Sequence, residues 1–257
     1  MNDFTGLVLT YNERENVSRL LDSLSWISRV VIVDSYSTDG TTEIAGKYPN
    51  VTLVQRPFDS FAGQCNFGLS NIETEWVLSL DADYVVTAEL STEIRKLDPS
   101  PSVAGYAVDF DYIIFGRALR SSLYPARTVL YRRQLAQYRD EGHGHRVTVN
   151  GQVEKLSARM CHDDRKPLSR WIQSQDKYAI VEADHLLDMQ STHLEPQDRL
   201  RLAIYFAPAV MFFYLLFGRG LILDGWRGWY YVCQRVIAEL LLSIRIIEQQ
   251  HKLERLK

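Results

Sequence analysis

The sequence has little cysteine and no excess of basic charge. Its three cysteines, Cys65, Cys161 and Cys233, lie far apart and lack the spacing of a metal site. This usage is typical of reduced thiols and excludes a disulfide framework. The 29 basic and 32 acidic side chains give a net charge of -3, and no basic run gathers on one segment. We therefore expect no nucleic-acid partner.

The sequence also lacks an export signal and a run long enough to span a bilayer. Asp3 and Thr5 interrupt the first residues, which do not follow the basic, apolar and small-residue order of a signal peptide. We expect the catalytic part to stay in the cytoplasm. The longest apolar run, residues 202–217, contains Pro208. At roughly 1.5 Å per residue it extends only about 24 Å, too short to cross the hydrocarbon core.

What is present is a globular composition in which strand and helix patterns alternate. The chain has 257 residues, of which 46% are hydrophobic and 24% are charged, enough for one core with a smaller annex. Strand patterns occupy residues 4–9, 30–33, 51–54 and 76–80, and helix patterns occupy 17–24, 43–48 and 61–69. This alternation predicts an α/β fold with a mostly parallel, doubly wound sheet flanked by helices. Asn12 is the expected N-cap of the first helix.

Beyond residue 83 the pattern changes. Residues 87–97 favour a helix, which the tract Asp98-Pro99-Ser100-Pro101 ends. Residues 105–115, 128–131 and 147–160 are rich in β-branched and aromatic side chains. These stretches predict further strands that extend or cover the sheet.

Carboxylates follow three of the four early strands. The first strand ends in the tract from Thr10 to Glu13, the second ends at Asp34, and the fourth leads into Asp81 and Asp83. Ligands of open α/β sheets bind outside the carboxyl ends of the strands, so we expect these groups to share one rim. Carboxylates at i and i+2 can lie on one face and repel each other unless a cation lies between them. Mg²⁺ and Mn²⁺ bind one or two carboxylates together with substrate phosphates. For each acid alone, a polar turn or helix cap is the alternative.

At these three tracts the sequence resembles family 2 glycosyltransferases with the GT-A fold. The similar segments are residues 9–13, 31–41 and 78–83, in the family's order and spacing. Trp26 and the segment from Trp76 to Asp83 are most similar to the branch that includes lipopolysaccharide-core β-1,4-glucosyltransferases. The resemblance covers roughly residues 4–180. It implies a Rossmann-like GT-A domain and an inverting sugar transfer.

The resemblance assigns the nucleotide to the first two strand ends. The loop with Thr10, Tyr11 and Glu13 would pack against the base and ribose, and Asp34 would hydrogen-bond the base. The aromatic face of Tyr11 suits stacking on a base.

The resemblance assigns the cation to the fourth strand end. Asp81, Ala82 and Asp83 would contact the nucleotide sugar, with Asp81 and Asp83 holding Mn²⁺ or Mg²⁺ and the ribose or diphosphate. His162 follows a predicted strand and resembles the late histidine that completes such metal sites. A structural role for a lone histidine is the alternative.

The tract from Gly63 to Gly68 departs from the family pattern. A basic residue and an Asn usually face the diphosphate there. Gln64 and Asn66 are candidate neutral donors to the diphosphate in this chain, while Cys65 stands where Arg is often found.

Sugar transfer also needs a base to deprotonate the acceptor hydroxyl. The tract from Tyr138 to Arg146 resembles the acidic acceptor-side motif, which makes Asp140 or Glu141 the candidate base, with His143 or His145 nearby. The similar branch has an acid after the second histidine, whereas this chain has Arg146.

The last third of the chain is helical and strongly apolar. The apolar run 202–217 is bordered by arginines and by an aromatic group. The arginines are at 199, 201, 219 and 227, and the aromatic residues are at 226 and 229–231. Such anchors are typical of an interfacial or re-entrant segment. A second helix with an apolar stripe is expected over 232–247. A buried core helix or an oligomer interface is the alternative.

From this sequence we expect a GT-A domain over 1–190, with a nucleotide-binding half (1–98) and an acceptor half (99–190), and a helical appendage over 191–257 that contacts the membrane or forms an oligomer. The expected activity is metal-dependent transfer from a nucleotide-diphosphate sugar, such as a UDP-sugar, to a lipid-linked or polysaccharide acceptor such as lipopolysaccharide core. The expected location is the inner face of the cell membrane. The alternatives are a sugar-phosphate nucleotidyltransferase and a non-catalytic membrane scaffold with a dead site.

Overall fold

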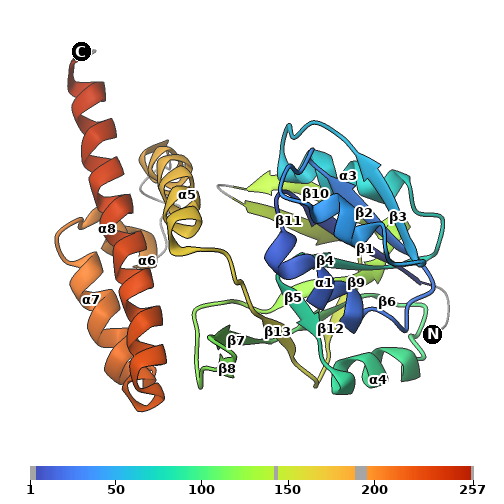
Figure 1. Ribbon diagram of the computed structural model, residues 1–257. Helices are drawn as coiled ribbons and strands as arrows, with labels where there is room; N and C mark the ends of the chain where they lie inside the picture. The colour runs from blue at the N-terminus through green and yellow to red at the C-terminus, as the bar shows by residue number, and fades with distance from the viewer. Residues whose placement is uncertain (1–3, 142–143, 189–195, 256–257) are drawn as a thin grey trace. The chain divides into compact units, whose positions relative to one another are not determined.

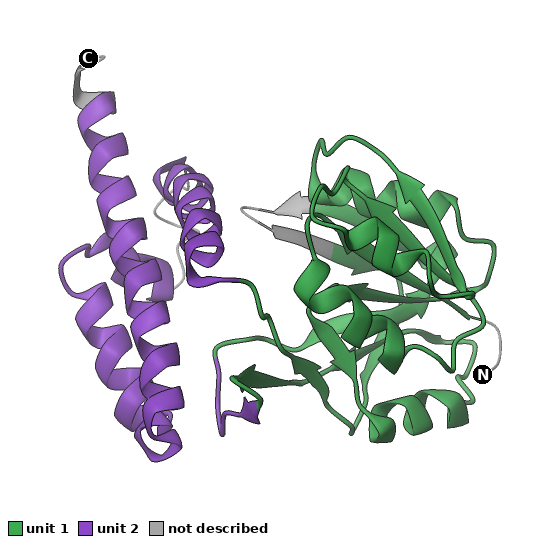
Figure 2. Cartoon of the chain, in the orientation of Figure 1, with its two compact units in different colours: residues 1–116, 123–166 green, residues 117–122, 167–257 purple. Residues whose placement is uncertain are grey.

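The computed structural model describes residues 4–141, 144–188 and 196–255 (Figure 1). The chain divides into two compact units, residues 1–116 with 123–166 and residues 117–122 with 167–257 (Figure 2). The first unit carries the three strand-end tracts. The second unit is helical apart from β8 (Arg117–Ala118).

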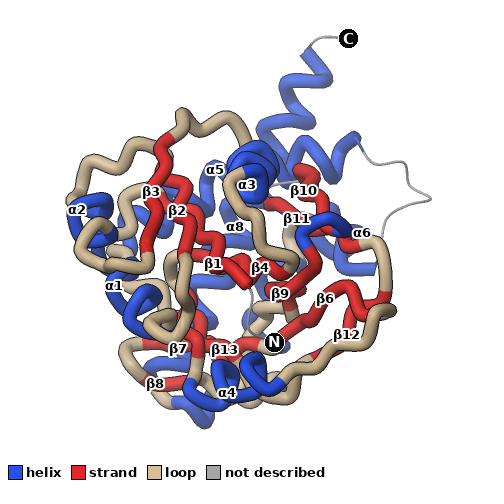
Figure 3. Tube along the Cα trace, turned by 90° about the vertical axis from the view of Figure 1, so that its right-hand side faces the viewer, coloured by secondary structure: helices blue, strands red, loops and turns tan. Residues whose placement is uncertain are grey.

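A seven-stranded sheet organises the first unit, in the order β12-β6-β9-β4-β1-β2-β3 (Figure 3). Its strands are β1 (Phe4–Thr10), β2 (Val30–Asp34), β3 (Val51–Gln55), β4 (Trp76–Asp81), β6 (Val103–Val108), β9 (Arg127–Arg132) and β12 (Gln152–Lys155). Strands β3, β2, β1 and β4 run parallel to one another, whereas β9 runs antiparallel to both β4 and β6. The predicted α/β fold with a mostly parallel sheet is confirmed.

Helices cover both faces of this sheet. They are α1 (Arg14–Ser23), α2 (Thr41–Ala45), α3 (Phe61–Ser70) and α4 (Ala88–Lys96). In β2, Val30 and Ile32 pack in one core with Leu20 of α1, while Val31 and Val33 pack in a second core with α3. The β-branched run is therefore fully buried because alternate residues point to opposite faces.

The first helix begins differently from the prediction. Helix α1 begins at Arg14, with Glu13 at the N-cap position and no side-chain capping bond. Asn12 is not the N-cap, because its side chain accepts a hydrogen bond from Thr38 N of the next loop instead. Helices α3 and α4 have conventional caps, since Ser60 Oγ and Thr87 Oγ1 accept from Gly63 N and Leu90 N.

A smaller sheet in the first unit joins β5 (Tyr84–Val86), β13 (Met160–His162) and β7 (Phe110–Ile114). Strand β13 pairs antiparallel with β5 and parallel with β7, which aligns His162 with Tyr84 and Tyr112. Because β5 begins one residue after Asp83, this pairing brings residue 162 beside the end of β4. A hairpin of β10 (Ala136–Glu141) and β11 (Gly144–Val149) follows a 3-10 turn, Arg133–Leu135.

The second unit contains α5 (Leu168–Asp188), α6 (Pro196–Leu202), α7 (Ala207–Phe213), a π-helical turn η2 (Tyr214–Gly218), a 3-10 turn η3 (Leu221–Asp224) and α8 (Trp226–Arg255). Ala183 and Leu186 of α5 pack with Leu242 and Ile246 of α8. Helix α5 groups with this unit, whereas the sequence pattern places residues up to 190 with the first.

The apolar run 202–217 is not one helix. Helix α6 ends at Leu202 and α7 begins at Ala207, with Pro208 in its first turn, where a missing backbone N–H is tolerated. The expected helix over 232–247 is longer, since α8 extends over Trp226–Arg255. Among the helices of the described ranges, none combines the length and apolar character needed to cross a membrane.

Candidate active site

The three strand ends singled out in the sequence lie next to one another. Strands β4, β1 and β2 are neighbours in the sheet, and Leu9 pairs with Asp81 while Thr10 pairs with Asp34. Parallel strands present their carboxyl ends at the same edge. The expected convergence of these polar groups on one rim is therefore what the sheet order produces.

The loops after β1 and β2 are bonded to each other. Asn12 N donates to Ser37 Oγ (2.8 Å), and Glu13 N donates to Thr41 Oγ1 (2.7 Å). Asn12 and Tyr36 have positive φ angles of 56° and 59°, a conformation that costs energy for residues other than glycine. The interlocked loops hold this strained geometry.

Each of these loops carries an exposed aromatic side chain. Tyr11 is 55% exposed and Tyr36 is 52% exposed. An exposed ring on an ordered loop offers a flat apolar face to a planar ligand such as a nucleotide base.

Asp34 is completely buried beneath these loops. Its carboxylate accepts hydrogen bonds from Thr10 Oγ1 (2.8 Å), from Ser37 N (2.9 Å) and Oγ, and from Gln55 Nε2 (3.1 Å). Asp34 therefore fixes the positions of both loops, and a ligand that bonds to it must share oxygens already used by the protein.

Asp83, His162 and Lys166 form a buried charged cluster. His162 Nε2 donates to Asp83 Oδ2 at 3.2 Å, and Lys166 Nζ lies 3.9 Å from the same oxygen. Burial alone would raise the pKa of Asp83, but His162 and Lys166 hold this pKa below its ordinary value. Burial disfavours the imidazolium, yet Asp83 raises the pKa of His162 above its usual range. Each of the two side chains therefore favours the charged form of the other.

Lys166 also joins the cluster to the loop after β1. Its ammonium lies 2.9 Å from Glu13 Oε1 and 3.6 Å from Asp164 Oδ1. Burial opposes a charged lysine, but the surrounding carboxylates raise the pKa of Lys166 above its usual value. Asn16 Nδ2 donates to Glu13 Oε2 (3.0 Å) and Asp164 Oδ1 (3.2 Å), which completes the network.

Aromatic rings fix the imidazole of His162. The Tyr124 ring stacks on it at 4.3 Å between centroids, and Tyr112 lies edge-on at 4.7 Å. Asp81 lies near the same aromatic group: burial, and after it the negative charge of Asp81, raises the pKa of Tyr84 and Tyr124. Ala82, between the two acids, is buried in the core.

The residues present are compatible with a divalent cation. Asp83 Oδ1 and His162 Nδ1 are buried and have no hydrogen-bond partner. Among the described residues, no group of three or more His, Cys, Asp or Glu side chains is positioned to hold an ion. Because Mg²⁺ and Mn²⁺ sites often combine one or two carboxylates with substrate phosphates, Asp81 and Asp83 suit such a shared site.

Gln64 and Asn66 are engaged with backbone groups. Gln64 is buried and its amide donates to Pro57 O at 2.9 Å. Asn66 Nδ2 donates to Tyr138 O at 3.0 Å and its oxygen accepts from Tyr138 N at 3.1 Å. Asn66 thus fastens α3 to β10. Cys65 is packed in the core beneath α3, so this position faces the sheet.

The two candidate bases, Asp140 and Glu141, belong to β10, where Asp140 pairs with His145. Their side chains, and those of His143, His145 and Arg146, lie outside the described residues. The strand is anchored just before them, because the buried Tyr138 hydroxyl donates to Ser79 Oγ of β4 at 2.8 Å.

Sequence reasoning missed Lys166, Asn16 and Asp164. The available signal was the charged run Asp163-Asp164-Arg165-Lys166 directly after His162. Its partners lie at the start of α1 and just after β4, which are distant in sequence, so spacing alone could not reveal the network.

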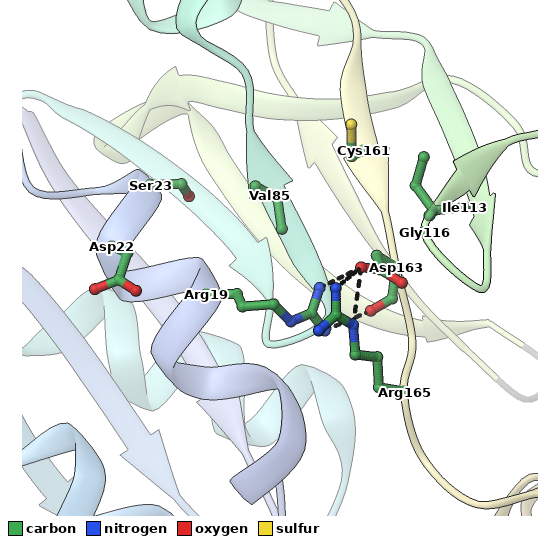
Figure 4. Close-up of a pocket in the computed structure, with 9 residues that line it drawn as sticks. All are labelled: Arg19, Asp22, Ser23, Val85, Ile113, Gly116, Cys161, Asp163 and Arg165. Atoms are coloured by element: carbon green, nitrogen blue, oxygen red, sulfur yellow. Dashed lines mark hydrogen bonds and ion pairs between the residues drawn. The ribbon is translucent and has the colours of Figure 1, made fainter.

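A cavity of about 450 Å³ is lined by residues of α1 and of the small sheet (Figure 4). Cys161 lines it, and because strand residues alternate, Cys161 points away from the side of His162. Arg19 and Arg165 both bond to Asp163 Oδ2 there, at 2.5 Å and 3.0 Å. Arg19 Nη2 also donates to Asn16 Oδ1 at 2.7 Å, so the cavity borders the network around Lys166.

The chain is similar to known glycosyltransferases along most of its length. It is 25% identical to the lipopolysaccharide core biosynthesis glycosyltransferase LpsC of Rhizobium meliloti, over 97% of this chain and 93% of that protein. It is 37% identical to an uncharacterized glycosyltransferase of Rickettsia conorii, but over only 36% of this chain and 33% of that protein.

The fold is similar to that of a mannosyltransferase from Pyrobaculum calidifontis, solved in complex with GDP-Man and Mn²⁺. The TM-score is 0.56 at 18% identity, over 96% of this chain and 88% of that chain. The model of glycosyl transferase family 2 matches residues 7–153. Because this match covers more than half of the chain, it shows that the chain is a glycosyltransferase belonging to family 2.

Proposed function

We propose that this enzyme is an inverting, metal-dependent transferase that moves a sugar from a UDP-sugar to a lipid-linked or polysaccharide acceptor such as lipopolysaccharide core. The observation that carries this proposal is the buried cluster of Asp83, His162 and Lys166 beside the interlocked loops after β1 and β2. The similarity to LpsC, named for lipopolysaccharide core biosynthesis, supports the acceptor class.

The nucleotide is assigned to the loops after β1 and β2. Tyr11 offers an exposed ring for the base, and Thr10 and Glu13 shape the pocket from the same loop. Asp34, held by four hydrogen bonds, orients the loops, and a bond from the base would share its carboxylate oxygens with these donors. Gln64 and Asn66 support the tract that borders the diphosphate.

The cation is assigned to Asp81 and Asp83, with His162 as the third group. When bound, Mn²⁺ or Mg²⁺ would stabilise negative charge on the departing nucleoside diphosphate. The orphaned Asp83 Oδ1 supports this assignment. Lys166 supplies a fixed positive charge at the same place, and it orients Glu13 and Asp83 through their carboxylates.

The acceptor is assigned to the side of β10. Asp140 or Glu141 removes the proton of the acceptor hydroxyl as its oxygen forms a bond to the anomeric carbon. The bond from that carbon to the diphosphate oxygen breaks, and the electron pair leaves with the nucleoside diphosphate. Attack opposite to the leaving group inverts the anomeric configuration.

The test is incubation of the full chain with radiolabelled UDP-sugars, with and without Mn²⁺. Slow hydrolysis that requires the cation and favours one sugar supports the proposal. Formation of UDP-sugar from UTP and a sugar phosphate would instead indicate a nucleotidyltransferase. If calorimetry detects no nucleotide binding, the site is a non-catalytic scaffold.

A further inference from the structure

Helix α8 has an apolar stripe on the side that is exposed. Six large side chains, Trp226, Trp229, Ile237, Leu240, Ile244 and Ile247, are between 36% and 57% exposed. With Cys233 between the second and third of them, they recur every three or four residues along the helix. Residues at this spacing share one helix face, which we name the outer stripe.

The opposite side of α8 is already used for packing. Leu242 and Ile246 are buried against α5. Arg245 Nη2 bonds to Asp176 of α5 at 2.6 Å and further fixes this contact. A surface helix in water normally carries polar residues opposite its buried side, so the outer stripe requires a separate explanation.

The turn after α7 extends the outer stripe. Leu215 and Leu216 of this region are buried, whereas Phe213 and Phe217 are 59% and 58% exposed. The ring of Phe212 contacts Trp229 at 5.6 Å and Phe213 at 5.2 Å, and Phe213 stacks on Phe217 at 6.2 Å. The outer stripe together with Phe213 and Phe217 forms one surface within the second unit, here named the apolar face.

Uncompensated positive charge accompanies this apolar face. Between Pro196 and Ile247 the chain has six arginines and three acidic residues. Of these acids, Asp224 pairs with Arg120 and Glu239 pairs with Arg201. Arg227, beside the outer stripe, lies over the Trp226 ring at 4.5 Å and has no acidic partner in the described part of the chain.

We propose that the apolar face docks in the plane of a lipid bilayer whose headgroups are anionic. Exposed Trp and Phe side chains suit the boundary between headgroups and acyl chains, and the Arg227 guanidinium complements anionic lipid phosphates. The outer stripe lies along α8, so this helix rests parallel to the surface. The inference rests on the proposed function in one respect: a lipid-linked acceptor would be met at such a surface.

The test is flotation of the full-length protein with phosphatidylcholine vesicles, with and without phosphatidylglycerol. We expect binding that requires the anionic lipid and weakens at high salt. The double variant Leu240→Ser/Ile244→Ser should bind at least about tenfold more weakly, because two exposed aliphatic groups no longer enter the bilayer. Arg227→Gln should weaken the preference for anionic vesicles.

Phe58→Ser is the matched control, since Phe58 is 53% exposed in the first unit and should not affect vesicle binding. Unchanged melting curves establish that the variants are folded. The inference is overturned if the double variant floats like the unmodified chain. It is also overturned if the chain does not bind vesicles and sedimentation shows a dimer that the substitutions Leu240→Ser/Ile244→Ser dissociate. In that case a second copy of the chain covers the apolar face. UDP binding, measured by calorimetry without vesicles, tests the donor site independently of either result.

Discussion

At the residue scale, the site is defined by how its charges compensate one another. Lys166 lies among Glu13, Asp83 and Asp164, and His162 bonds to Asp83. A buried carboxylate without such partners would be protonated instead. The cluster thus keeps Asp83 ionised in a place where burial works against its charge.

Replacement of Asp83 by Asn should reduce sugar-nucleotide hydrolysis and transfer by at least about a hundredfold. A neutral amide lacks the negative charge that binds the divalent cation. The side-chain shape is retained, so circular dichroism should show an intact fold. Asp109→Asn is the control, since Asp109 pairs with Lys155 in the same unit and should retain activity. Wild-type activity of Asp83→Asn with Mn²⁺ present would refute the cation assignment.

Replacement of Lys166 by Met should weaken UDP binding in the presence of Mn²⁺ about tenfold, the effect of one lost charge-assisted contact. Lys166→Arg should restore part of the affinity, because it keeps the positive charge. Calorimetry measures both, with Lys155→Met as the control for loss of a surface lysine. Equal affinities for all the variants would exclude Lys166 from the donor site.

The Asp83–His162 ion pair should make stability depend on pH in the absence of divalent cations. Because the pKa of His162 is raised in the folded chain, its protonation stabilises the fold. This contribution is complete at pH values below the unfolded pKa of about 6.5 and is lost as pH rises through the folded pKa. The lowered pKa of Asp83 stabilises the fold above about 3.9, and its contribution is lost only in strong acid.

Melting temperatures should therefore fall as pH rises from about 6 to 8, near the ordinary histidine pKa. In His162→Gln this slope should flatten. If the variant and the unmodified chain lose the same amount of stability over that range, another group is responsible.

At the scale of elements, the sequence predicted the strands and the polar residues at their carboxyl ends. It did not predict which residues the helices contact. The run Val30–Val33 is buried on both faces, as its β-branched composition indicates. The position of Cys65 could not be derived, because the short α3 has apolar residues on more than one side and only its packing on the sheet shows which side is buried. Lys166 was missed because its charge is compensated by residues distant in sequence.

The contact between α3 and β10 should support the acceptor side of the site. Asn66→Ala removes two hydrogen bonds to Tyr138 and should destabilise the fold by about 1–2 kcal/mol. Because β10 carries Asp140 and Glu141, we expect slower transfer at unchanged UDP affinity. Ser70→Ala, which removes a bond within α3 only, is the control. A matching loss of UDP affinity would place Asn66 at the donor site instead.

At the scale of the whole molecule, the chain comprises two compact units with separate cores. The candidate donor site lies within the first unit, so ligand binding should stabilise that unit. Separate cores also allow unfolding in more than one step.

Calorimetric unfolding should show two transitions. Leu242→Ala removes a buried side chain between α5 and α8 and should destabilise the second unit by about 2–5 kcal/mol. UDP with Mn²⁺ should raise only the other transition. A single transition that both changes shift together would show that the units unfold as one.

The chain passes from the first unit into the helical part of the second between Lys166 and Pro167. Lys166, whose ammonium compensates the charges of the carboxylates, is therefore also the last residue before this junction. A single peptide bond links it to the helical part. An insertion between residues 166 and 167 would lengthen the tether at the point where the ammonium is anchored. Insertions that spare catalysis should be sought farther along the chain, past the start of α5.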